Sequence, residues 1–145
     1  MKNLLVLLFA IIFAISFAQP LQTPSGRDRQ LILDCLRAKT KRSLKSKPVK
    51  FVVQHIKSQD GWAFMSGRCV KPDGTPFEYK GTEYEQYIKE GLFDDWVCAL
   101  MRKVKGKWQI KAWALGATDV PWAGWWGDFG APESIFPPHG ASAGE

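Results

Sequence analysis

The chain has 145 residues, in which 20 lysines and arginines outweigh 14 acidic residues and give a formal net charge of +6. This length suits one domain around one core and is too short for two domains with separate cores. Two histidines and three scattered cysteines lack the spacing of zinc ligands, and the sequence has no phosphate-binding loop, dinucleotide fingerprint or nucleophile elbow. We therefore expect no metal and no cofactor.

The N-terminal segment has the pattern of an export signal. Lys2 gives a positive start, residues 4–17 are almost wholly apolar, and Ser16 and Ala18 supply small residues where signal peptidase cuts. The apolar run is shorter than the roughly 20 residues that span a membrane. The sequence predicts a signal peptide over residues 1–18, cleavage after Ala18, and a periplasmic or secreted protein without a transmembrane anchor or a nucleic-acid partner.

The next segments predict a flexible lead-in and a helix. Residues 19–26 are rich in Pro, Ser, Thr and Gly, which is typical of an unstructured entry. A helix is predicted from Arg27 to about Lys45, ended by Pro48, because apolar side chains recur on one face. This face consists of Leu31, Ile32, Cys35 and Leu36.

The predicted helix and its C-terminal flank are strongly basic. Against Asp28 and Asp34 stand nine basic residues, which would favour an anionic partner such as a phospholipid surface, an acidic glycan or an acidic protein. A solvated helix face is the simpler interpretation of the same pattern. The nine residues are Arg27, Arg29, Arg37, Lys39, Lys41, Arg42, Lys45, Lys47 and Lys50.

The middle of the chain predicts a hairpin followed by a short helix. Strands over 49–58 and 62–70 are joined at Asp60-Gly61, a dipeptide that favours a two-residue hairpin turn. The sequence from Thr82 to Glu85 has the form of a capping box at a helix start, and Gly91 is a natural stop.

A second hairpin and a C-terminal tail complete the predicted domain. Two apolar runs within residues 93–113 flank Lys105-Gly106 and predict two adjacent antiparallel strands. We expect one α+β domain over residues 27–136, in the order α-β-β-α-β-β, with the N-terminal helix packed on a four-stranded antiparallel sheet. Residues 137–145 are expected to be disordered.

A tryptophan-rich segment follows the last predicted strand. Asp119 and Pro121 favour an N-cap and a first helical turn, which would place Trp122, Trp125 and Trp126 on one face. These side chains would either cover the second face of the sheet or form a binding surface for a sugar or a protein. The sequence leaves both interpretations open.

The cysteines suggest one disulfide. Cys69 ends one predicted strand and Cys98 begins another, so the two would lie opposite each other if the strands were antiparallel neighbours. Cys35 would then be left over. The alternative is that all three are free, buried thiols that act as small hydrophobic side chains.

Candidates for catalysis are few. The hairpin register places His55 opposite Ser66, for which a cross-strand hydrogen bond is a simpler explanation than a nucleophile and its base. Asp94 and Asp95 point to opposite sides of a strand entry and are interpreted as surface charges. Asp119 is a possible general acid, and its N-cap role needs no further assumption.

The sequence also carries a family resemblance. The stretch from Lys107-Trp108-Gln109 through GATDVPWAGW, together with DGWAF, resembles a group of small exported bacterial proteins of unknown function over about residues 27–132. This resemblance implies a bacterial source and a periplasmic or secreted location. The order of a helix and then a curved sheet is similar to cystatin-like and nuclear-transport-factor-like folds, and no catalytic dyad of the latter transfers to this chain.

Two functions are therefore considered. The first is a non-catalytic periplasmic or secreted binding or accessory protein, for which an inhibitor-like role fits the size and a cell-envelope component or another protein is the partner. The alternative is a small enzyme of nuclear-transport-factor-like fold, with a pocket between the first helix and the sheet that uses Asp119 or His55. A buried acid beside His55 would favour the enzyme, whereas a filled core with exposed tryptophans would favour the binding protein.

Overall fold

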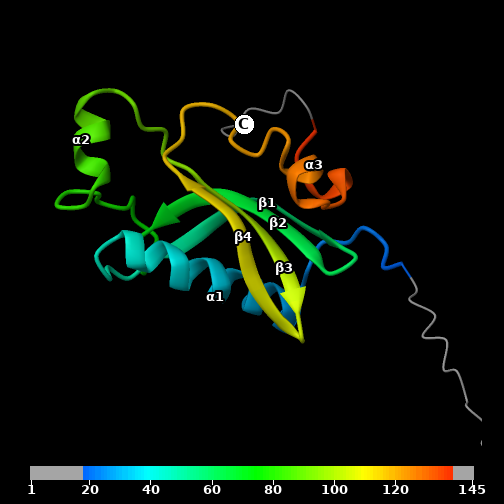
Figure 1. Ribbon diagram of the computed structural model, residues 1–145. Helices are drawn as coiled ribbons and strands as arrows, with labels where there is room; N and C mark the ends of the chain where they lie inside the picture. Colours follow the sequence, from blue (N-terminus) through cyan, green and yellow to red (C-terminus); the bar gives the residue numbers. More distant parts are fainter. Residues whose placement is uncertain (1–17, 139–145) are drawn as a thin grey trace, which may run out of the picture.

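The computed structural model describes residues 18–138, so residues 1–17 of the predicted signal peptide and residues 139–145 of the predicted disordered tail lie outside it (Figure 1). The helices and strands follow in the order α1 (Gly26–Ser43), β1 (Lys50–Gln59), β2 (Trp62–Val70), α2 (Tyr84–Lys89), β3 (Val97–Val104), β4 (Lys107–Leu115), α3 (Trp125–Phe129) and a short 3-10 helix, η1 (Glu133–Ile135).

The described residues form one four-stranded antiparallel sheet in the order β1-β2-β3-β4, which confirms the predicted α+β class. Both predicted hairpin turns are confirmed. Asp60 and Gly61 have φ angles of 50° and 73°, and Lys105 and Gly106 have φ angles of 49° and 76°. Two successive left-handed residues match the twist of the flanking strands, which is why Asp-Gly and Lys-Gly suit these positions.

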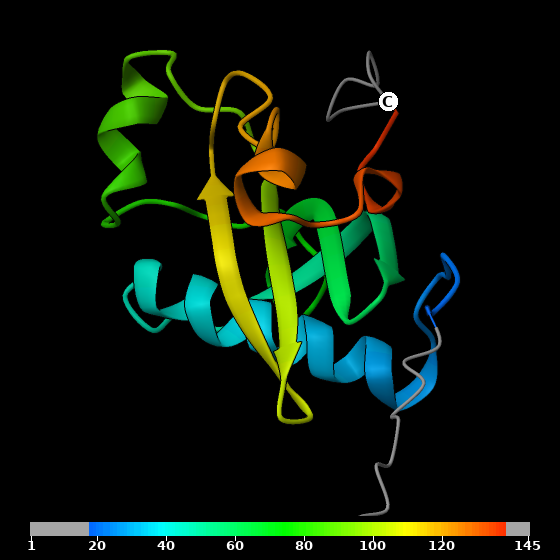
Figure 2. The same cartoon turned by 45° about the vertical axis from the view of Figure 1, so that its right-hand side comes forward.

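The two faces of the sheet are covered by different parts of the chain. In Figure 2, α1 lies behind the sheet and α3 lies in front of it. Because side chains alternate along a strand, neighbouring residues contribute to opposite cores. Met65 and Met101 pack with Leu36 of α1, whereas Phe64 and Leu100 pack on the other side. The C-terminal segment that covers this second side contributes Trp122, Ala131, Ile135 and Phe136.

The predicted disulfide between Cys69 and Cys98 is wrong. Cys98 lies directly opposite Ser66 in the β2–β3 ladder, and Cys69 is three residues further along β2. Because Cys69 is an odd number of residues from Ser66, its side chain points to the opposite face of the sheet. Cys69 therefore lies on the α1 side of the sheet and Cys98 on the other side. Both thiols are free, as is Cys35, and burial raises the pKa of Cys69 to about 12 and also raises the pKa of Cys98.

The predicted capping box of α2 is not formed, because the N-cap is Glu83 rather than Thr82 and makes no side-chain capping bond, but Thr82 and Glu85 do bond the chain just before the helix. The Thr82 hydroxyl accepts a hydrogen bond from the backbone N–H of Tyr84 at 3.3 Å and donates one to the Tyr79 carbonyl at 2.6 Å. The Glu85 carboxylate accepts a bond from the N–H of Gly81 at 2.8 Å. The two side chains therefore hold the chain at the helix entry.

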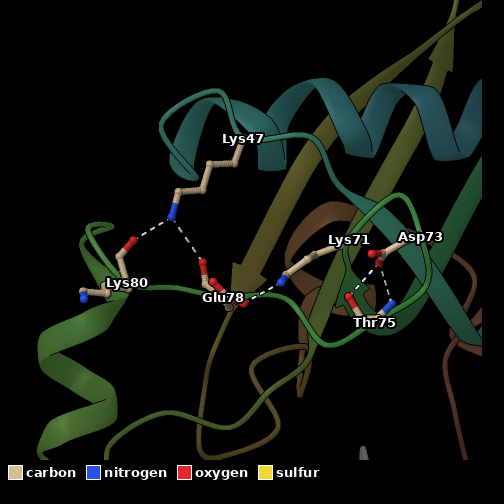
Figure 3. A network of polar contacts seen from close by, with 6 residues as sticks. All are labelled: Lys47, Lys71, Asp73, Thr75, Glu78 and Lys80. Carbon is tan, nitrogen blue, oxygen red and sulfur yellow. Dashed lines mark hydrogen bonds and ion pairs between the residues drawn. The ribbon is translucent and has the colours of Figure 1, made fainter.

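A polar network ties the loop between β2 and α2 to the segment that follows α1 (Figure 3). The ammonium of Lys47 donates to the backbone carbonyls of Glu78 at 3.3 Å and Lys80 at 2.6 Å. On the same loop, Lys71 forms an ion pair with the Glu78 carboxylate. These contacts satisfy loop carbonyls that have no strand partner, and they fix the loop beside α1.

Candidate functional site

The C-terminal tryptophans serve mainly as a cover for the sheet. Trp122 is only 4% exposed and packs edge-on against Phe64 and Trp96, with ring centroids 5.4 and 5.1 Å apart. Trp125 and Trp126 are half-buried against the same core. Of the three predicted binding residues, therefore, Trp122 belongs to the core and the other two retain only part of their ring surface.

The predicted catalytic candidates have positions in the fold that do not require a catalytic role. His55 lies opposite Ser66, as the hairpin register predicts, but its Nε2 donates a hydrogen bond to the Ile135 carbonyl at 2.8 Å rather than to Ser66. Ser66 is buried and Asp119 is exposed in the connection between β4 and α3. Helix α3 begins at Trp125, after a left-handed Gly124, so Asp119 is not its N-cap as predicted.

The half-buried His55 makes stability depend on pH. Burial is the main cause that lowers its pKa below the usual 6.5, with a smaller lowering by Lys57 and an opposing effect of the bond to Ile135. As pH falls below 6.5, the unfolded chain takes up a proton that the folded chain resists, so the free energy of unfolding decreases until the lower folded pKa is passed. We expect the urea midpoint to fall between pH 7 and pH 5.

The variant His55→Gln, which keeps an N–H donor for Ile135, should reduce this slope. His139→Gln serves as the control, since it removes the other histidine of the chain. An equal slope in the wild type and in His55→Gln would contradict the role assigned to His55.

A groove of about 810 Å³ lies between α1 and β4. This volume lies in the range of roughly 300–1,000 Å³ that is typical of ligand sites. The α1 side is one stripe of the helix, and the β4 side extends along most of the strand. The lining consists of Leu31, Cys35, Ala38, Lys39, Arg42, Gly106, Lys107, Trp108, Ile110, Lys111, Ala112 and Trp113.

The charged residues of the groove are all cationic. Within the described chain, its lining contains Lys39, Arg42, Lys107 and Lys111, contains no carboxylate, and forms no ion pair. Like charges gathered around one depression raise the positive potential inside it. Lys111 is the extra residue where the register shifts in the middle of the β3–β4 ladder, and such a bulge re-aims the side chains beside it.

Two indole rings line the groove between the cations. The Nε1 of Trp108 donates to Asp28 at 3.1 Å, and the Nε1 of Trp113 approaches the Thr40 hydroxyl at 3.4 Å. The ammonium of Lys39 lies 5.1 Å from the ring centroid of Trp113, a cation–π distance. Both rings are therefore held in place before a ligand arrives, and both remain partly exposed.

Cys35 lies in the groove and contacts the strand. Its Sγ donates a hydrogen bond to the Trp108 carbonyl at 3.4 Å, and burial raises the pKa of the thiol. The lining has neither a histidine nor a carboxylate to act as a base toward this thiol. The groove thus offers charge and apolar surface for binding, and no acid–base pair for catalysis.

Sequence reasoning identified one side of this groove and missed the other. The basic helix was recognised, including Lys39 and Arg42, but Trp108 and the lysines of β4 were not assigned to a site. The alternation of polar and apolar residues from Lys107 to Trp113 is visible in the sequence. Its meaning depends on which strand lies beside α1, which no local pattern specifies.

Comparison with family models, curated proteins and solved structures gave no match for this chain. In the part of the chain that the structure covers, no helix is both long and apolar enough to cross a membrane. Residues 18–138 also contain no group of three or more His, Cys, Asp or Glu side chains placed to hold a metal ion.

Proposed function

We propose that the chain is an exported, non-catalytic binding protein that holds an anionic ligand in the groove between α1 and β4. The observation that carries this proposal is the convergence of four cations without ion-pair partners in the described chain on a groove lined by Trp108 and Trp113. Export is supported by the signal-like pattern of residues 1–18. A cell-envelope component is then the natural source of the ligand.

The cations attract an anionic ligand over a distance, and the apolar and aromatic side chains of the groove provide contact area. An exposed ion pair contributes about 0.2–1 kcal/mol, so the four cations act together rather than through one dominant contact. Their contribution should decrease as salt rises, because the Debye length shortens from about 10 Å at 0.1 M to about 3 Å at 1 M.

The double variant Lys39→Ser/Lys111→Ser tests this assignment. Affinity can be measured by calorimetry for three polyanions: heparin oligosaccharide, polyglutamate and phosphatidylglycerol vesicles. For whichever of these binds, we expect about tenfold weaker binding, equivalent to about 1.4 kcal/mol for two lost charge contacts.

The control is Lys50→Ser/Arg68→Ser, which removes the same charge from exposed positions on β1 and β2, away from the β4 edge. It should leave affinity within about twofold of the wild type. Equal losses in the two double variants would show that net charge, rather than the groove, governs binding.

The enzyme alternative places its pocket in the same region, between the first helix and the sheet. Its candidate residues do not support it there, because neither His55 nor Asp119 is part of the groove lining. His55 instead contacts the Ile135 carbonyl and the ring of Phe64, on the opposite side of the sheet from α1.

A further inference from the structure

We infer that the anionic ligand is an acidic polysaccharide, which lies lengthwise along β4 with its sugar rings on the indoles and its acidic groups between two rows of cations. This inference rests on the proposed function and specifies its ligand. Three features of the groove support this inference. They are the spacing of the cations, the apolar and aromatic side chains between them, and the bond that Cys35 already makes to the edge strand β4.

The cations form two rows of different spacing. Lys107 and Lys111 are four residues apart on β4, which corresponds to at most about 13 Å along the strand, because the register shift lies at Lys111. Lys39 and Arg42 are three residues apart on α1, or about 4.5 Å along the helix. A single compact anion such as phosphate would engage one end of the strand row. A chain with an acidic group on successive units would engage both rows along their length.

The floor between the rows is apolar and aromatic. Leu31, which is 41% exposed, lies with Ala38 and Ile110 on the same lining as the two indoles. A ligand that carries charge alone would leave this surface uncovered. A pyranose ring has an apolar face of C–H groups that packs on an indole, while its carboxylate or sulfate projects toward the cations.

The edge of β4 argues against an extended acidic peptide. A peptide that adds to a sheet needs the free N–H and C=O groups of an edge strand. In this structure the thiol of Cys35 already bonds the Trp108 carbonyl at the middle of the groove. A flat anionic membrane is also a poor fit, because it would reach the rim of a concave groove and not the indoles within it.

The ligand test compares oligosaccharides that differ in one property. A hexamer of galacturonic acid should bind at 50 mM salt, and its methyl-esterified form, which has the same rings without charge, should bind at least about tenfold more weakly. Monomeric galacturonate should also bind at least about tenfold more weakly, because it contacts only part of each row. Binding of the ester equal to that of the acid would overturn the inference.

The protein test uses a change on the exposed surface of α1. Ala38→Glu introduces a carboxylate into the groove lining at an exposed helical position, so the fold should be kept. Affinity for the hexamer should fall about tenfold, whereas Ala38→Gln, of nearly the same size, should stay within about threefold. Equal effects of the two variants would contradict a charge-based site.

Cys35 reports on occupancy without a substitution. Its alkylation by N-ethylmaleimide, a neutral reagent, should slow at least about threefold when the hexamer is bound, as measured by peptide mass spectrometry. The buried Cys69 and Cys98 serve as internal controls. Unchanged alkylation of Cys35 with the hexamer bound would place the ligand elsewhere.

Two further ligands separate this inference from the function on which it rests. If hexaglutamate or phosphatidylglycerol vesicles bind at the groove and the hexamer does not, an anion-binding groove remains and the polysaccharide assignment is wrong. If no anion loses affinity in Lys39→Ser/Lys111→Ser, both the assignment and the proposed function are wrong.

Discussion

Replacing Phe64 by alanine should lower the free energy of unfolding by about 3–5 kcal/mol, the range measured for buried aromatic residues. The ring is fully buried on β2 and forms the centre of the core on the C-terminal side. Its neighbours include Trp122 at 5.4 Å, Trp125 at 6.5 Å and Phe136 at 4.7 Å between centroids. Deleting it removes the surface on which the C-terminal segment packs.

Urea unfolding followed by circular dichroism measures this loss, and Phe129→Ala is the matched control. Phe129 is 39% exposed on α3, so its truncation should cost less than about 1 kcal/mol. A loss below about 1.5 kcal/mol for Phe64→Ala would show that the C-terminal segment packs on the sheet less firmly than described.

Replacing Gly67 by alanine should destabilise the fold by about 3 kcal/mol, at the upper end of the overpacking range. A Cβ on Gly67 would overlap the backbone carbonyl oxygen of Val52 and would lie 3.1 Å from the Cα of Val53. These are backbone atoms, so the neighbouring strand would have to move. Gly67 pairs with Val53, and the β1–β2 register shifts directly beyond this pair, between Val53 and His55. Glycine permits the close approach of the two strands there.

Gly127→Ala is the control for this change. Gly127 lies in α3, and a Cβ there would meet no atom within 4 Å. The substitution should leave stability unchanged or raise it by up to about 1 kcal/mol, since alanine is the better helix former. Equal unfolding midpoints for the Gly67 and Gly127 variants would contradict the close approach of β1 to β2.

The features that sequence reasoning predicted correctly depend on neighbouring residues. Asp60-Gly61 and Lys105-Gly106 define their turns because the preference for left-handed backbone is a property of the dipeptide itself. The strands on either side follow from the turn, since a two-residue loop determines their register. This is also why the opposition of His55 and Ser66 could be predicted.

The features that were missed depend on how distant segments meet. The β2–β3 register determines which face of the sheet Cys69 and Cys98 each occupy. These two strands are joined by a long connection that contains α2 and no tight turn. The groove requires that α1 lie beside β4 rather than another strand. The placement of Asp119 failed for a related reason, because the turn before α3 is built around Gly124 rather than around an acidic cap.

The C-terminal cover of the sheet has a consequence for the order of events during synthesis. The bond from His55 to the Ile135 carbonyl joins residues 80 positions apart, and Phe64 packs against Trp122, Trp125 and Phe136 of the C-terminal segment. Until this segment has left the ribosome, one side of the sheet remains open and the growing chain cannot complete its core. The core on the C-terminal side of the sheet therefore closes only after the last residues of this segment have been made, whereas the core on the α1 side does not depend on them.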